Sequence, residues 1–361
     1  MKVPVSTKPR GIALFIVMIA VFLLSVMAAI FAMSMKVETK LAQNAEHEEQ
    51  LLWLGRSGVE LARYVLAQEM TIPGEPYDAL NQIWAGGAGS LGESNSPLNG
   101  ISLDNYQIGD GSVSVKIIDL ERYANINTAG PQIIQQALNV MGVDANGVSV
   151  VSDSILDWIS PGENPRLAGA KSDYYQSLDP PYYCKDAPMD DLSELLLVRG
   201  IQDHPEIYWG GSATNYHPAA FQQKFGLVNS LFEAPDYPFG LKDVFTPISD
   251  GQININTASA DVLQLLPGVD APTAQNIIKF RAGPDGVEGT ADDTPFANLG
   301  QLVQAGVPPP LIGQLGRICA TRSATFEVRV TARIGDFHRE YVAILVRRSP
   351  ADIQILRFYW R

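Results

Sequence analysis

The sequence predicts an α+β protein in which a long N-terminal helix packs on an antiparallel sheet and a large, mainly α-helical segment is inserted between the strands. Three observations predict this fold. An apolar run near the N-terminus continues into an amphipathic helical pattern. Residues with strict apolar/polar alternation occur near position 115 and again near position 330. The roughly 200 residues between these two stretches carry mostly helix and loop signals.

The apolar run from Ile12 to Met35 contains no charge, Pro or Gly. About 20 such residues suffice to cross a ~30 Å hydrocarbon core as a helix. Lys2, Lys8 and Arg10 precede the run, and the positive-inside bias keeps them in the cytoplasm. The run is too long for an ordinary cleaved secretory signal. We therefore expect a chain attached to the inner membrane at its start, with its body in the periplasm.

The helical pattern continues beyond Met35. Its apolar positions recur at three- and four-residue spacing, at Val37, Leu41, Leu51, Leu54, Gly58, Leu61, Ala62 and Val65. Thr71-Ile72-Pro73-Gly74 ends the pattern. A single helix from Ile12 to Met70 would be about 90 Å long, with its second half packing on a globular head. Residues 73–99 are rich in Gly, Pro, Ser and Asn and are predicted to be a connection.

The strands are predicted from alternation. Residues 106–119 form a hairpin that turns at Asp110-Gly111, with Val113, Val115 and Ile117 on one face. Residues 326–333 alternate, turn at Gly335-Asp336 and return through residues 338–347. Residues 353–360 are predicted to add a last strand.

Composition limits the possible functions. The chain of 361 residues has 26 basic and 39 acidic residues, a net charge of −13, which disfavours binding nucleic acid through a broad basic face. The four histidines are scattered and no nucleophile, P-loop or dinucleotide motif occurs. The sequence therefore predicts no enzymatic activity.

Cys184 and Cys319 are the only cysteines. In an oxidising periplasm two such thiols are expected to pair as a structural disulfide. The alternative is two buried free thiols.

The inserted segment contains an internal sequence repeat. Asn-Ile-Asn-Thr-Ala occurs at residues 125–129 and again at 254–258, each time before an apolar helical stretch. The second copy continues as Leu-Pro-Gly-Val-Asp and looks like a helix-hairpin-helix unit, whose backbone amides hold a phosphate in DNA-binding proteins. However, Asp270 replaces the usual second Gly of the hairpin. We favour a packing unit in which Asp270 caps the next helix and Pro272 lies in its first turn, with DNA binding as the alternative.

The N-terminus resembles the class III signal of type IV pilins and pseudopilins, a short basic leader that ends in Gly before an apolar helix. The resemblance implies cleavage by a prepilin peptidase between Gly11 and Ile12, with methylation of the new N-terminus. A plain single-pass anchor is the alternative. Pilins and pseudopilins carry a Glu at the fifth mature position, which here is Ile16. Because a buried Glu in hydrocarbon is costly unless it is paired, its absence is typical of the terminal subunit of a filament.

Further motifs between the two copies of Asn-Ile-Asn-Thr-Ala resemble the K-type minor pseudopilin of type II secretion systems. They are Ser154-Ile155-Leu156-Asp157-Trp158-Ile159, Ala170-Lys171-Ser172-Asp173-Tyr174-Tyr175, Pro181-Tyr182-Tyr183 and the segment from Asp191 to Gly200. Locally, Asp190 or Asp191 with Glu194 is also typical of a helix cap with a capping-box acid, and Trp158 is expected in the core.

The resemblance implies a structural role at the tip of a periplasmic pseudopilus. It implies a complex with I-type and J-type minor pseudopilins and other pseudopilins of the filament, initiation of assembly and support for export of folded proteins across the outer membrane. The expected domains are a leader (1–11), the transmembrane half of the helix (12–35), the periplasmic half with the connection and first pilin-type strands (36–120), the inserted helical domain (121–320, with the helix-hairpin-helix at about 253–283) and the C-terminal strands (321–361).

A Gly-rich acidic loop at residues 283–294 is the best candidate for an ion site. Its carboxylates are Asp285, Glu288, Asp292 and Asp293, and Ca²⁺ prefers six to eight oxygen ligands. The loop lacks the residue order of an EF-hand. The family resemblance implies calcium in the inserted domain, and a solvated acidic turn is the alternative.

Overall fold

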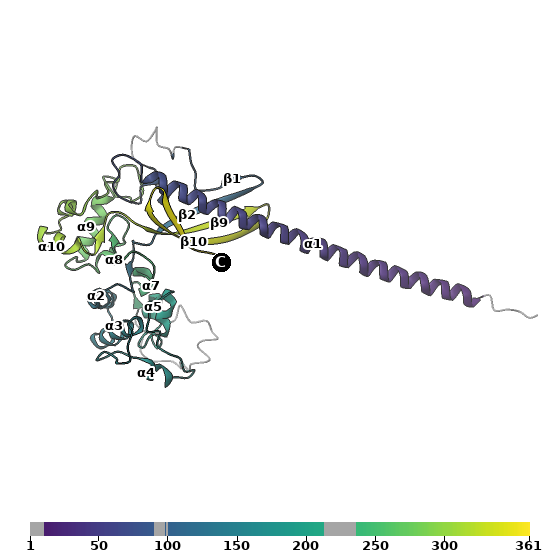
Figure 1. The fold of residues 1–361 in the computed structure, drawn as a ribbon, viewed down its shortest axis with the longest axis horizontal. Helices are drawn as coiled ribbons and strands as arrows, with labels where there is room; N and C mark the ends of the chain where they lie inside the picture. The colour runs from purple at the N-terminus through teal and green to yellow at the C-terminus, as the bar shows by residue number, and fades with distance from the viewer. Residues whose placement is uncertain (1–10, 90–97, 99, 213–235) are drawn as a thin grey trace, which may run out of the picture.

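The computed structural model describes residues 11–89, 98, 100–212 and 236–361. The predicted leader lies outside these residues except for Gly11. The predicted single helix is confirmed as α1 (Gly11–Glu69), which runs out of the head as a long stem (Figure 1). Among the described residues α1 is the one helix long and apolar enough to cross a membrane.

The head contains a five-stranded antiparallel sheet in the order β1-β2-β9-β10-β11. Its strands are β1 (Tyr106–Ile108), β2 (Gly111–Asp119), β9 (Thr325–Ile334), β10 (Phe337–Ser349) and β11 (Asp352–Trp360). The predicted hairpins are therefore confirmed. β2 pairs with β9, so strands from both ends of the globular sequence meet at the centre of one sheet. The core faces of these two strands carry Val113, Val115 and Ile117 opposite Ala332, Val330 and Val328.

Helix α1 covers one face of this sheet along β2, β9 and β10. Two glycines allow close approach: a Cβ on Gly55 would collide with the Tyr341 ring, and one on Gly58 with Val330. Of the predicted apolar stripe, the residues from Leu51 onward lie in or against this core, but Val37 and Leu41 are exposed. The stem is therefore bare between the apolar run and the head.

Helix α1 and strand β10 run in the same direction. Glu48 pairs with Arg339, Gly55 abuts Tyr341, and the Leu66 carbonyl accepts a hydrogen bond from Arg347. From the first contact to the last, α1 rises about 27 Å while β10 advances about 26 Å. The sheet is thus aligned with the stem.

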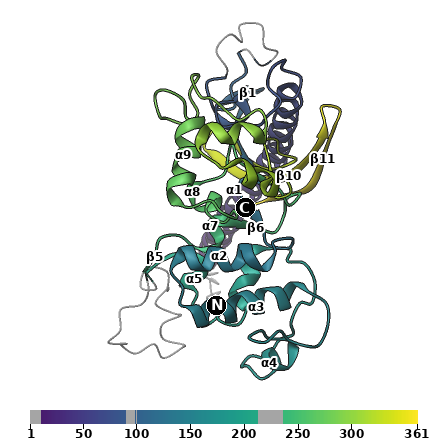
Figure 2. The same cartoon turned by 90° about the vertical axis from the view of Figure 1, so that its left-hand side faces the viewer.

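The segment between β2 and β9 forms two lobes (Figures 1 and 2). The first lobe, residues 124–246, lies beside the sheet and contains β3 (Ala124–Asn125), α2 (Pro131–Met141), α3 (Ala145–Ile159), α4 (Ser172–Gln176), η2 (Leu192–Leu197), α5 (Glu206–Trp209), β4 (Gly211–Ser212), β5 (Asp236–Tyr237), α7 (Leu241–Val244) and β6 (Phe245–Thr246). The second lobe, residues 253–320, lies at the end of α1 and contains β7 (Ile253–Asn254), α8 (Ala260–Leu263), α9 (Ala271–Arg281), η4 (Leu299–Ala305), α10 (Pro309–Leu315) and β8 (Cys319–Ala320). One continuous apolar core fills both lobes.

Short strand pairs close each lobe. β3 pairs in parallel with β6 in the first lobe, and β7 pairs in parallel with β8 in the second. Sequence analysis did not predict these pairs, because two-residue strands carry no periodicity. The connection before β1 contains one short helix, η1 (Ile83–Ala85).

Candidate functional site

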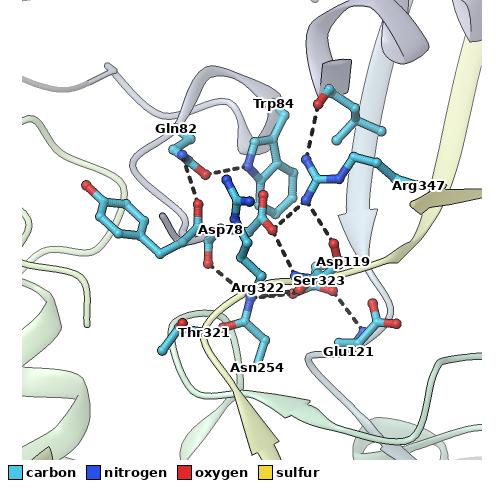
Figure 3. Close-up of polar contacts among 12 residues, drawn as sticks. Asp78, Gln82, Trp84, Asp119, Glu121, Asn254, Thr321, Arg322, Ser323 and Arg347 are labelled. Carbon is cyan, nitrogen blue, oxygen red and sulfur yellow. Dashed lines mark hydrogen bonds and ion pairs between the residues drawn. The ribbon is translucent and has the colours of Figure 1, made fainter. Parts of the chain in front are cut away.

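The most elaborate polar site lies where the head meets the second lobe (Figure 3). We call it the junction cluster. Its members are all buried and come from five separate parts of the chain: Asp78, Asp119, Glu121, Asn254, Ser323 and Arg347.

An ion pair between Arg347 and Asp78 forms one side of the junction cluster. The Arg347 Nη2 atom lies 2.5 Å from Asp78 Oδ2, and the two side chains are 1% and 2% exposed. The guanidinium also donates to the backbone carbonyls of Leu66 and Ser323, at 3.2 and 2.8 Å. The bonds to these carbonyls offset part of the cost of burying the ion pair, while Arg347 Nε has no hydrogen-bond partner among the described residues. Arg347 of β10 thereby contacts α1, the connection and the segment just before β9.

Asp119 is the last residue of β2, and its carboxylate binds side chains of the second lobe. Its carboxylate accepts hydrogen bonds from the Thr257 hydroxyl at 2.5 Å, the Ser323 hydroxyl at 2.7 Å and Asn254 Nδ2 at 3.2 Å. Burial raises the pKa of Asp119, and the hydrogen bonds from the Thr257 and Ser323 hydroxyls oppose that shift. Asn254 also donates to the Asp78 carbonyl at 3.0 Å. One amide group therefore bridges two of the three acidic residues of the junction cluster, Asp78 through its backbone carbonyl and Asp119 through its carboxylate.

Glu121 is fully buried, and backbone groups are its partners. Its carboxylate accepts from the N–H of Thr325 at 2.9 Å and of Asp250 at 3.1 Å. Burial, followed by the nearby charge of Asp119, raises the pKa of Glu121 to about 9. The side chain is therefore largely protonated at neutral pH.

The junction cluster was missed by sequence analysis, although the strand pattern contained a signal. In β2 the core face carries Val113, Val115 and Ile117, and the next position on that face is Asp119. In β10, Leu345 and Arg347 are alternate positions on the core face of the strand in the same way. A charged residue on the core face of a strand needs a buried partner. Chemically, the cluster can hold the lobe and the head together.

The two Asn-Ile-Asn-Thr-Ala motifs adopt the same structure. In each, the first Asn side chain accepts from the backbone N–H two residues later, at 2.9 Å in both copies. The second Asn side chain accepts from a distant backbone N–H, Met189 for Asn127 and Phe296 for Asn256. The side-chain amides of these Asn residues donate to the carbonyls of the same two residues, at 3.0 Å in each case. The repeated Asn-Ile-Asn-Thr-Ala sequence is therefore also a repeated structural unit.

The repeat extends further than the sequence analysis recognised. Gly142-Val143-Asp144-Ala145 joins α2 to α3, just as residues 268–271 (Gly-Val-Asp-Ala) join α8 to α9. Both glycines have positive φ, 88° and 72°, which favours Gly at each position. Each lobe therefore carries one helix-hairpin-helix unit.

The predicted role of Asp270 as a helix cap is confirmed. Its carboxylate accepts from the Thr273 N–H at 2.9 Å, with Pro272 in the first turn. Asp144 caps α3 in the same way, accepting from Asn146 and Gly147 at 3.0 Å. In a DNA-binding hairpin the amides at this helix start face a phosphate. Here the chain's own carboxylates accept from them and place negative charge there.

The four acidic residues predicted to bind calcium share one loop but do not converge. Asp292 and Asp293 both accept from the Thr290 hydroxyl, at 2.7 and 3.2 Å. Asp285 accepts from the Val287 N–H, while Glu288 accepts from Arg281 Nε at 2.5 Å. Burial raises the pKa of Asp293, and hydrogen bonding by Thr290 lowers that of Asp292. Among the described residues no group of three His, Cys, Asp or Glu side chains is placed to hold a metal ion.

The predicted disulfide between Cys184 and Cys319 is not formed. Both thiols are free and buried. Cys184 lies in the first lobe, where its Sγ is 3.7 Å from the Asp157 carbonyl, whereas Cys319 lies in β8 of the second lobe. Burial raises the pKa of Cys184 to about 11 and that of Cys319 to about 12. The compartment argument was wrong because it carries no information about the distance between two residues.

Other predicted residues have structural positions. Trp158 is buried and contacts the rings of Tyr175 and Tyr182. The capping box of Asp191 and Glu194 is present at η2. Gly11 begins α1 in the described chain and Ile12 follows it.

Comparison with known proteins places these features in a family. Residues 112–207 match the model of type II secretion system protein K, and residues 249–288 match a helix-hairpin-helix model. The chain is 23% identical to type II secretion system protein K of Pseudomonas aeruginosa over 96% of this chain and 91% of that protein. It is 22% identical to the Pectobacterium carotovorum protein over 97% and 96%.

These matches support the resemblance to the K-type minor pseudopilin of type II secretion systems. Members of this family are minor pseudopilins, structural components of secretion machinery. The fold agrees: a chain in the crystal structure of the GspK-GspI-GspJ complex from enterotoxigenic Escherichia coli superposes with a TM-score of 0.59 at 18% identity, covering 89% of this chain and 99% of that chain.

Proposed function

We propose that this protein caps the tip of a periplasmic pseudopilus as a K-type minor pseudopilin, in a complex with I-type and J-type minor pseudopilins. There it initiates assembly and supports export of folded proteins across the outer membrane. One observation carries the proposal: the second lobe lies at the end of α1 opposite the membrane-spanning run (Figure 1). A further subunit stacked along the stem axis would meet this lobe.

Two other observations support a tip position. Ile16 occupies the place where filament subunits carry a Glu, so the stem offers no carboxylate to a neighbouring N-terminus. The structural neighbour was solved in a complex with GspI and GspJ.

The test is to co-express the full chain with the I-type and J-type subunits of its own secretion system. The complex is then purified in detergent and its mass measured. We expect a ternary complex, and gold-labelled protein K at one end of isolated filaments. Absence of a complex, or label along the shaft, would overturn the proposal.

We also propose that prepilin peptidase cleaves between Gly11 and Ile12. Gly11 is the first described residue of helix α1, so the helix from Ile12 onward would stay in the processed chain. N-terminal sequencing of protein from cells should begin at Ile12, and Gly11→Val should block processing. A mature chain that begins at Met1 would contradict this. With a processed N-terminus, the body is expected in the periplasm, where protease added to spheroplasts should digest it.

Calcium binding by the acidic loop is a further proposal, and it requires the loop to rearrange. Glu288 would have to leave Arg281 before it could join Asp285 and Asp293. The melting temperature should rise with Ca²⁺ relative to chelator, because a ligand that binds the folded state stabilises it. The rise should be lost in Asp285→Asn/Asp293→Asn and kept in Asp110→Asn, a control in an exposed turn. An equal rise in all three proteins would exclude the loop.

The DNA-binding alternative has one supporting observation, the helix-hairpin-helix match. The capping carboxylates of Asp144 and Asp270 oppose it. A mobility shift with short duplex DNA, repeated at two salt concentrations, distinguishes the two functions, since phosphate contacts weaken steeply with salt.

A further inference from the structure

The two edges of the five-stranded sheet differ. The edge strand β1 has three residues, Tyr106–Ile108, whereas β11 has nine, Asp352–Trp360, none of them Pro. β11 pairs with β10 on one side, and no strand among the described residues pairs with its other side. Soluble proteins usually keep edge strands short or charged, because open N–H and C=O groups invite pairing with another chain. β1 follows this rule and β11 does not.

Strand β11 also exposes large apolar side chains. Trp360 is 66% exposed, and Ile355, Leu356 and Tyr359 are exposed as well. Helix α1 packs mainly on β2, β9 and β10; in β11, Ile353 is buried and Phe358 is partly buried against the same core, while the other large apolar side chains of the strand stay exposed. A bulge near Leu356 interrupts the pairing with β10, but the residues beyond it, from Arg357 to Trp360, pair regularly with Ile344 to Tyr341.

The hydrogen-bond pattern shows which groups face outward. The Arg361 N–H donates to the Glu340 carbonyl at 3.0 Å. Because inward and outward groups alternate along an antiparallel strand, the N–H and C=O of Trp360 and Phe358 point away from β10. The Phe358 ring stacks on Tyr341, with ring centres 5.5 Å apart, and Arg357 donates to the Asp190 carbonyl of the first lobe at 3.2 Å. The outward groups are therefore held in place from both faces.

We propose that the open edge of β11 pairs with a β-strand of a partner pseudopilin, which extends the sheet and covers Trp360 and Tyr359. This inference rests on the proposed function, because it takes its partner from the minor pseudopilin complex. An added strand satisfies the outward N–H and C=O groups, and alternate apolar side chains on it would cover the exposed rings.

A second copy of this chain does not fit the edge. α1 runs in the same direction as β10 and β11 runs antiparallel to β10. The usual two-fold pairing of one β11 with another is antiparallel. It would send the two α1 helices in opposite directions, and both could not then enter the same membrane from one side. A strand from a different chain carries no such restriction.

Photocrosslinking of the full chain tests the contact. A benzoylphenylalanine residue replaces Tyr359 on β11 or Tyr106 on β1, two exposed tyrosines on opposite edges of the sheet. Each variant is co-expressed with tagged I-type and J-type subunits. We expect a crosslink to one of these subunits from position 359 and none from position 106. Equal crosslinking at both positions, or crosslinks only between copies of this chain, would refute the proposal.

A backbone variant tests the hydrogen bonds. Trp360→Ala removes the ring, whereas Trp360→Pro also removes an outward N–H that β10 does not use. We expect the proline variant to bind its partner at least about tenfold more weakly than the alanine variant, while both variants keep the same melting temperature. Equal affinities would refute strand pairing. If wild-type protein forms no complex at all, the proposed function fails; if the complex forms and both β11 tests are negative, this inference alone fails.

Discussion

The two Asn-Ile-Asn-Thr-Ala motifs have the same sequence and local fold but different surroundings. In the first lobe, Asn125 Nδ2 donates to the Ser249 carbonyl at 2.9 Å. In the second, Asn254 Nδ2 reaches the Asp78 carbonyl, Asp119 Oδ2 and Ser323 Oγ at 3.0, 3.2 and 2.8 Å. The first copy organises its own lobe, whereas the second fastens its lobe to the sheet. The second copy thus differs from the first in function because Asp78, Asp119 and Ser323 lie next to its first Asn.

The largest effect on stability is expected at the ion pair of Arg347 and Asp78, next to the second motif. Arg347→Ala leaves Asp78 buried without its cation, which should lower the free energy of unfolding by about 3–5 kcal/mol. Arg348→Ala is the matched control, because Arg348 is exposed and lies 3.8 Å from Asp352, so its loss should cost under about 1 kcal/mol. Denaturant unfolding of the detergent-solubilised chain measures both. Similar losses in the two variants would show that the pair is unimportant.

The second prediction compares the motifs directly. Asn254→Ala should cost about 2–3 kcal/mol, because it leaves buried acceptors of the junction cluster unsatisfied, whereas Asn125→Ala should cost about 1–2 kcal/mol. Hydrogen exchange should show the difference in place: Asn254→Ala deprotects β9 and β2, and Asn125→Ala deprotects the first lobe. Equal costs with equal exchange patterns would contradict the distinction between the two copies.

The third prediction concerns pH. The pKa of Glu121 is about 9 in the folded protein and starts from 4.5, so the folded state binds the proton more tightly. Its contribution to stability is therefore greatest below pH 4.5, falls as the pH rises from about 4.5 to about 9, and changes little above that. Glu121→Gln cannot ionise and should lose this slope. Asp270→Asn, which replaces a carboxyl of lowered pKa, should keep it. Unfolding midpoints at several pH values decide the matter, and an unchanged slope in Glu121→Gln would refute the assignment.

The smallest effects are expected at the helix caps, where the two copies should behave alike. Asp144→Ala and Asp270→Ala each remove one N-cap and should each cost about 1 kcal/mol. Asp→Asn at either position should restore most of the loss, since Asn also caps well. A much larger cost at one cap would show that its hairpin has a further role.

Much of the fold follows from periodicity in the sequence. Alternation predicted β2, β9, β10 and β11 nearly to the residue, and the three- and four-residue spacing predicted α1. The spacing did not show where packing begins, so Val37 and Leu41 were wrongly placed on the packed face.

The candidate site was less accessible to sequence reasoning. Asp78 and Arg347 are 269 positions apart, and nothing in a linear pattern joins them. The second hairpin was recognisable by its Pro-Gly-Val-Asp, whereas the first has Met141 in place of that Pro and was overlooked. The cysteine pairing failed for a similar reason, because spatial distance leaves no trace in the sequence.

The bond from Arg347 to the Leu66 carbonyl has a mechanical consequence. Because the stem and β10 run side by side in the same direction, an axial force on the stem loads their shared contacts in shear, many at once. The same guanidinium donates hydrogen bonds to the Asp78 carboxylate and the Ser323 carbonyl. Tension on the stem is therefore transmitted to the two residues that bind Asn254 of the second lobe. A force applied at the membrane end of the stem would therefore move the stem, the sheet and the segments that hold the second lobe together.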